Sequence, residues 1–140
     1  MVRHFVICCA LFLFLGCGKP FAEKDLVLLN GYWEIELVKF PDGSTKTYKV
    51  NANIDYIQVN TKKGFRKKVR PRLDGTFGTS DDTKSFEVIK NADGYIFLYR
   101  NGLSQWQESL ISISETSFTV KNEANISYTY KRFTPIAIAK

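Results

Sequence analysis

The chain is a succession of short strand-like runs separated by turn residues, and this pattern limits the fold more than any other feature. In residues 32–40, apolar side chains alternate with Glu34 and Glu36, as a half-buried strand requires. Residues 74–83 are expected to form a loop. After residue 16, no stretch shows the spacing of apolar residues that is typical of a helix. Eight further strands are expected over residues 45–50, 55–60, 65–73, 85–90, 95–100, 105–113, 117–121 and 126–133.

Nine strands with short connections favour an all-β fold, an antiparallel up-and-down β-barrel of about eight to nine strands. Asp93-Gly94 and Asn101-Gly102 are residue pairs typical of tight hairpin turns. Strands joined by such turns pair antiparallel, and closing the sheet removes its exposed edges. A two-sheet sandwich is the alternative arrangement.

The first residues have the layout of a secretory leader that ends at a cysteine. Arg3 precedes the apolar residues 5–15, which Gly16 and Cys17 follow. This run is shorter than the roughly 20 residues that span a bilayer as a helix. We expect residues 1–16 to be a lipoprotein signal peptide that is removed. Residues 17–27 are then a flexible tether with a lipid anchor (palmitate) on Cys17, and residues 28–140 form the barrel domain. Secretion without lipidation is the alternative.

Processing at this position removes the residues that most catalytic sites use. The leader takes away His4, Cys8 and Cys9, and lipidation consumes the sulfur of Cys17. Nucleophilic triads need a histidine base, and zinc sites draw on Cys and His. The loop acids Asp74, Asp81 and Asp82 lack the spacing of an EF-hand. We therefore expect a protein that is not an enzyme and holds no metal and no cofactor.

The same processing indicates where the chain works. Gly18 carries no inner-membrane retention signal after the lipidated cysteine, so the expected location is the bacterial cell envelope, anchored in the outer membrane. A monomer is expected there. An exported, tethered protein does not meet nucleic acid, which excludes that partner class.

Seven basic residues and no acid lie within residues 62–72. Basic clusters bind polyanions, and an anionic lipid or glycan suits the envelope. The alternative is a solvated hairpin face whose lysines protect an exposed edge. The seven residues are Lys62, Lys63, Arg66, Lys67, Lys68, Arg70 and Arg72.

Four aromatic residues form a candidate ligand site. Tyr95, Phe97 and Tyr99 share one strand face, and Trp106 follows on the next strand. Such residues line apolar ligand cavities in small barrels. In a chain this short they can equally well fill the core.

Two places resemble the lipocalin family. Gly31-Tyr32-Trp33 opens the first strand and is similar to the lipocalin Gly-x-Trp signature, while Arg132 supplies the basic residue of the last strand. Over residues 28–133 the chain resembles the small lipocalin-like lipoproteins of Bacteroides and Flavobacterium. The resemblance implies a barrel that binds a small apolar or amphipathic ligand. The alternative function is a structural or adaptor lipoprotein that binds an anionic lipid or glycan through its basic hairpin.

One contact follows from strand periodicity. Tyr128, Tyr130 and Arg132 share a face, and an inward face places Arg132 over the indole of Trp33, at the base of the barrel. A desolvated contact of this kind contributes up to about 2 kcal/mol. The alternative is a solvated Arg132 at the strand end.

Overall fold

The computed structural model describes residues 21–135 and contains a short 3-10 helix followed by nine strands. In chain order these are η1 (Glu23–Leu29), β1 (Gly31–Lys39), β2 (Thr45–Thr47), β3 (Ile54–Asn60), β4 (Lys63–Pro71), β5 (Phe77–Asn91), β6 (Gly94–Asn101), β7 (Ser104–Ile113), β8 (Ser117–Asn122) and β9 (Ser127–Arg132). None of the helices within these residues has the length and apolar character needed to cross a membrane.

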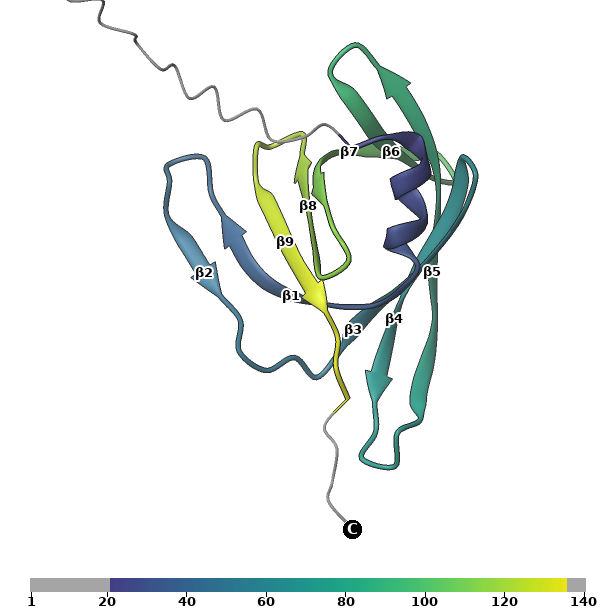
Figure 1. Cartoon of the computed structure of the whole chain (residues 1–140), viewed down its shortest axis with the longest axis vertical. Coiled ribbons are helices and arrows are strands. Elements are labelled where there is room, and N and C mark those ends of the chain that lie inside the picture. The colour runs from purple at the N-terminus through teal and green to yellow at the C-terminus, as the bar shows by residue number, and fades with distance from the viewer. Residues whose placement is uncertain (1–20, 136–140) are drawn as a thin grey trace, which may run out of the picture.

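Eight of the strands form a closed antiparallel barrel. Neighbours pair in the order β1-β3-β4-β5-β6-β7-β8-β9, and β9 pairs back onto β1 from Trp33↔Arg132 to Lys39↔Ser127. The short β2 pairs with β1 alone and stands outside the barrel wall (Figure 1). The antiparallel up-and-down barrel predicted from the sequence is confirmed by this strand order, and the sandwich is not formed.

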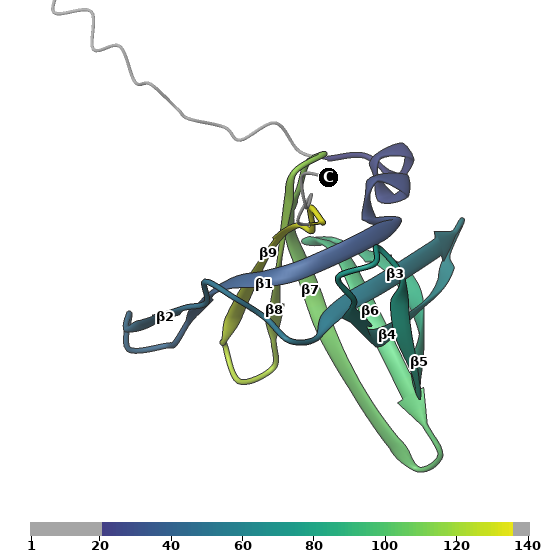
Figure 2. The ribbon, with the colours of Figure 1, turned by 90° about the horizontal axis from the view of Figure 1, so that it is seen from below.

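The two ends of the barrel differ. At one end, here called the closed end, lie η1 and the β3–β4, β5–β6 and β7–β8 turns. At the other, the open end, lie the β4–β5, β6–β7 and β8–β9 turns. Figure 2 shows η1 and the β6–β7 turn on opposite sides of the molecule.

Helix η1 corrects the predicted tether. Leu26 and Leu29 are buried in the barrel core, and the backbone N–H of Ala22 donates to Asp25 Oδ2 at 2.7 Å. Residues 23–27 therefore belong to the folded domain, although they were expected to be flexible. A helix of seven residues is too short to show the repeating apolar face by which helices are predicted. The signal peptide and Cys17 lie outside the described residues.

Strand β5 is longer than expected and replaces most of the loop predicted at residues 74–83. It begins at Phe77, which pairs with Pro71 at the end of β4. The register shifts between Lys67 and Val69, where extra residues of β5 bulge out. Polar residues of an exposed hairpin carry no alternating apolar pattern, so the sequence gives no strand signal there.

A bulge in β1 changes which side chains face inward. The register of β1 against β9 shifts between Ile35 and Leu37. Val38 is consequently buried, where simple alternation placed Leu37. On the other edge of β1, Asn51 Nδ2 donates to the Ile35 carbonyl at 3.0 Å, and Tyr48 N–H donates to the Glu36 carbonyl at 2.9 Å.

Aromatic side chains fill the closed end and the middle of the barrel. Trp33 packs edge-on against Phe118 at 4.8 Å between ring centroids, and Phe118 stacks on Tyr130 at 4.7 Å. Gly64 leaves room for the ring of Phe86, because a Cβ there would lie 2.6 Å from Phe86 Cζ. The side chains on the inside of the barrel thus pack tightly around Trp33, Phe118 and Phe86.

Candidate functional site

The predicted contact between Trp33 and Arg132 is present and forms the base of the barrel. The guanidinium carbon of Arg132 lies 3.8 Å from the Trp33 ring centroid. Arg132 Nη1 also donates to the carbonyl of Asn30 at 2.7 Å, and Nη2 donates to the carbonyl of Leu28 at 2.8 Å. Gly31 is required here, because its φ is +124° and a Cβ would meet Arg132 Nη1 at 2.7 Å. These contacts join η1 to the first and last strands.

The four aromatic candidates occupy two different places. Tyr95 and Phe97 belong to the filled core, with Tyr95 packed against Phe21 at 5.6 Å. Tyr99 and Trp106 lie nearer the open end, where their rings stack at 5.3 Å and 4°. Phe97 fills the interior, and Tyr95 also borders a hollow beside Phe21. Tyr99 and Trp106 line a pocket at the open end.

This pocket has a volume of about 280 Å³ and lies inside the open end of the barrel. Its walls come from β3 to β9, and its lining mixes aromatic rings with charged groups. The lining residues are Asp55, Arg66, Lys67, Lys68, Asp82, Lys84, Tyr99, Trp106, Glu108, Asn122, Tyr128 and Tyr130.

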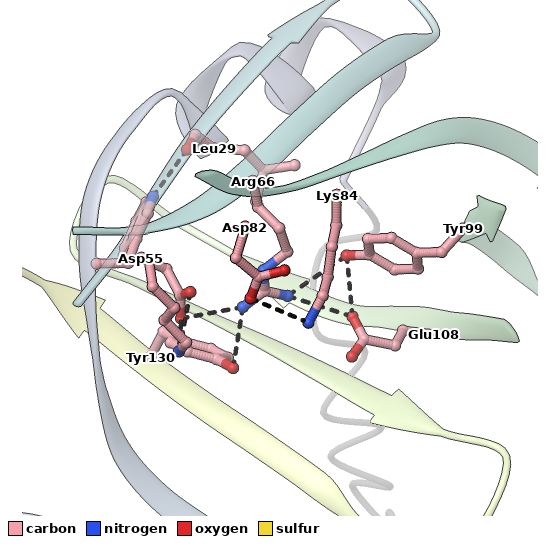
Figure 3. Close-up of polar contacts among 10 residues, drawn as sticks. Leu29, Asp55, Arg66, Asp82, Lys84, Tyr99, Glu108 and Tyr130 are labelled. Carbon is pink, nitrogen blue, oxygen red and sulfur yellow. Dashed lines mark hydrogen bonds and ion pairs between the residues drawn. The ribbon is translucent and has the colours of Figure 1, made fainter. Parts of the chain in front are cut away.

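A buried arginine with four partners forms the floor of the pocket (Figure 3). Arg66 Nη2 donates to Asp55 Oδ2 and to the Tyr130 hydroxyl, both at 3.1 Å. On its other side, Nη1 donates to the Tyr99 hydroxyl at 3.4 Å and to Glu108 Oε2 at 3.5 Å. The Arg66 side chain is 12% exposed and the Asp55 side chain 4%. Burial of these charges is tolerated because each has an opposite charge and hydrogen bonds.

Burial and mutual charge fix the protonation of this cluster. Burial raises the pKa of the Tyr99 phenol well above the ordinary value, and it also raises the pKa of the Tyr130 phenol. The Arg66 charge opposes both rises. Burial works to lower the pKa of Arg66, but Tyr130, Tyr99, Asp55 and Glu108 outweigh it and raise that pKa. The two phenols are therefore neutral and Arg66 is charged across the physiological pH range.

Two lysines stand at the rim of the pocket. Lys68 Nζ lies 3.0 Å from Asp55 Oδ1, and Lys84 Nζ lies 3.7 Å from Asp82 Oδ2. Their side chains are 53% and 46% exposed, respectively, so both ammonium groups remain accessible to solvent. The lining as a whole contains one more basic than acidic residue.

The seven basic residues singled out in the sequence do not form one surface. Arg66 points into the barrel, and Lys68 lies at the pocket rim. Lys67 lies over the Tyr56 ring, with its Nζ 5.9 Å from the centroid. The other four basic residues are exposed and lie at opposite ends of the barrel. Lys62 and Lys63 are at the β3–β4 turn of the closed end, and Arg70 and Arg72 are near the β4–β5 turn of the open end.

Sequence reasoning did not select Asp55, Glu108 or Tyr130 as site residues. Two of them carried a usable signal. Asp55 shares the inward face of β3 with Ile57 and Val59, and Glu108 lies two residues from Trp106 on β7. A charged residue on an otherwise apolar face predicts a buried, paired charge. Within residues 21–135 no cluster of three or more His, Cys, Asp or Glu side chains could hold a metal ion.

Comparison with known proteins gives similarity in structure alone. No protein-family model matches the chain. No curated protein matches it either. Among solved structures, a lipocalin-like protein from Bacteroides uniformis is 11% identical, with a TM-score of 0.47 over 76% of this chain and 99% of that one. Lobster apocrustacyanin A1 is also 11% identical, with a TM-score of 0.44 over 79% of this chain and 63% of that one.

Proposed function

We propose that the chain is an outer-membrane lipoprotein of the bacterial envelope whose lipocalin-like barrel binds a small amphipathic molecule in its open end, without catalysing a reaction. The observation that carries this proposal is the pocket itself. It places the Tyr99–Trp106 stack beside a buried and fully paired Arg66. Concave sites that combine apolar walls with a few fixed polar groups are typical ligand sites.

The charges of the pocket favour a ligand with an anionic head. Arg66 is already neutralised by Asp55 and Glu108, so it serves to shape the floor. Lys68 and Lys84 lie at the rim with about half of their side chains exposed. A carboxylate or phosphate at the rim and an apolar ring or chain against Trp106 fit this arrangement. With about 280 Å³, the pocket is at the lower limit of common ligand sites, about 300 Å³, so the ligand is small.

The lipoprotein part of the proposal is supported by the leader and by Cys17 in the sequence. Intact mass spectrometry of the chain purified from its membrane tests it directly. The expected mass lacks residues 1–16 and includes a diacylglyceryl group on Cys17. An unmodified Cys17, or a leader still attached, contradicts the proposal.

Native mass spectrometry of the same preparation tests for a bound small molecule, which the proposal predicts. A fluorescence titration then locates the site. The chain has two tryptophans, so a Trp33→Phe variant reports on Trp106 alone. Anilinonaphthalene sulfonate is a suitable probe, because it joins aromatic rings to one anionic group.

A Lys84→Gln variant is expected to bind this probe about tenfold more weakly, which corresponds to about 1.4 kcal/mol. Lys90→Gln is the matched control, because Lys90 is exposed at the end of β5 away from the pocket. Equal weakening in both variants, or a Trp106 signal that does not respond to the probe, would show that the pocket is not the binding site.

A further inference from the structure

The N-terminal segment is built into the closed end of the barrel. Phe21, the first described residue, packs on Tyr95, where β6 begins. Leu26 and Leu29 of η1 are buried, and Trp33 Nε1 donates to the Leu29 carbonyl at 2.7 Å. The chain therefore enters the folded domain at this end.

The distance from Cys17 to the barrel is short. Only residues 18–20 separate Cys17 from Phe21. An extended chain advances at most about 3.6 Å per residue, so the four steps reach about 14 Å. Strand β7 runs from the open end to the closed end over ten residues, which is about 33 Å along the strand. Because barrel strands tilt by about 35–45°, this is about 25 Å along the barrel axis, so the tether is shorter than the barrel.

Both ends carry exposed apolar side chains, and at the open end these are Leu73 (80% exposed) and Leu103 (109%). The short tether therefore selects the closed end, and the apolar side chains there are what would meet the lipid.

Val27 on η1 is 61% exposed, and Ile111 on β7 is 49% exposed. A hollow of about 870 Å³ lies beside Phe21, and its lining includes Tyr95, Ile111 and Ile113. The lining also includes Glu23, Lys90 and Asp93. A surface that combines apolar and charged side chains suits the boundary between lipid headgroups and acyl chains.

We propose that the closed end rests on the membrane that holds lipidated Cys17, with Val27, Ile111 and the hollow beside Phe21 against the lipid surface. The pocket around Trp106 then faces away from that membrane, into the aqueous compartment. This inference rests on the proposed lipidation of Cys17. For the proposed function, this orientation means that the ligand reaches the pocket from water. The ligand does not enter from the bilayer that holds the anchor.

Two labelled variants of the full, lipidated chain test the orientation. In the mature protein the sulfur of Cys17 is a thioether, so a maleimide dye reacts only with an introduced cysteine. Ala92→Cys places the dye in the exposed β5–β6 turn at the closed end, and Leu103→Cys places it at the fully exposed tip between β6 and β7. Each variant is reconstituted into phosphatidylethanolamine–phosphatidylglycerol vesicles that contain a spin-labelled lipid as quencher.

The dye at position 92 is expected to be quenched several-fold more strongly than the dye at position 103. Insertion of ten Gly and Ser residues between residues 20 and 21 removes the length limit, and is expected to lower the quenching at position 92. Val27→Lys combined with Ile111→Lys is expected to lower it as well, because the apolar contact is lost.

The outcomes separate this inference from the proposal that supports it. Equal quenching at the two positions, or stronger quenching at position 103, overturns the orientation while lipidation stands. A chain whose intact mass shows no lipid and which does not bind the vesicles overturns the lipoprotein proposal and the orientation together. The probe titration at Trp106 is unaffected by either result, because it uses the pocket alone.

Discussion

At the scale of single residues, Arg66 is the most informative side chain in the barrel. It is a buried cation that lies between two carboxylates and two phenols. The sequence alone groups Arg66 with the six other basic residues of 62–72 and predicts that it lies at the surface. Alternation alone could not place it inward, because Gly64 and Lys68, its neighbours on the same face of β4, are not apolar.

Replacement of Arg66 by leucine is expected to lower the free energy of unfolding by about 3–5 kcal/mol, because Asp55 and Glu108 are left buried without their main cation. Urea denaturation followed by far-UV circular dichroism measures this loss. Arg70→Leu is the control, since Arg70 is exposed and surface changes of this kind stay within about 0.5 kcal/mol. Similar losses in both variants contradict a structural role for the Arg66 cluster.

The raised pKa values of Tyr99 and Tyr130 predict a loss of stability in alkali. An ordinary tyrosine has a pKa of about 10. The folded phenols hold their protons at higher pH than the unfolded ones, so stability falls as pH rises above about 10. Tyr99→Phe is expected to reduce this fall.

Absorbance at the phenolate band provides the check on this prediction. At about pH 10.5, where ordinary tyrosines are largely ionised, the folded wild type and folded Tyr99→Phe are expected to show equal phenolate absorbance. A lower absorbance in the variant shows that Tyr99 ionises normally and that burial does not protect it.

At the scale of elements, the sequence predicted the strands with a clear alternation of apolar and polar residues. It predicted β1, β3 and β6 to β9 to within a few residues. It missed η1, because seven residues are too few for a helical period, and the first half of β5, because that half lies in an exposed hairpin. The alternation of apolar and polar residues thus identifies the strands that have one face on the core.

The packing of η1 is expected to contribute much of the stability of the closed end. Leu29 is fully buried against the core. Leu29→Ala is expected to cost about 2–5 kcal/mol through lost burial and the cavity that remains. Val27→Ala on the exposed side of η1 is the control for helix propensity, and equal effects on the urea midpoint would mean that η1 is not held by the core.

At the scale of the whole molecule, the interior changes character along the barrel axis. Trp33 and Phe118 fill the closed end, while Arg66 and Trp106 line the open end. Both layers belong to one closed sheet, and in the described part of the chain one hydrophobic cluster contains Trp33, Phe118 and Tyr99 and packs against Trp106. The sequence predicted the closure and the contact of Trp33 with Arg132. It did not predict the polar layer, because that layer depends on the register of five strands, β3, β4, β6, β7 and β9.

A single core predicts one cooperative unfolding transition. Trp33 and Trp106 report on opposite ends of the barrel, so variants with either one replaced by phenylalanine isolate each signal. In each variant the fluorescence midpoint in urea is expected to coincide with the midpoint from circular dichroism. Separate midpoints for the Trp106 signal would show that the open end unfolds on its own.

Next to the β1 bulge, the edge of β1 that faces β3 and β2 is held by few backbone hydrogen bonds. Between its pairings with β3 and β2, one edge of β1 is closed by the Asn51 amide and by Tyr48 N–H rather than by a continuous ladder. Few bonds must break there for local opening. Amide hydrogens of residues 48–53 are expected to exchange with deuterium sooner than those of β6 and β7, so this edge of β1 opens before the continuous β6–β7 ladder does.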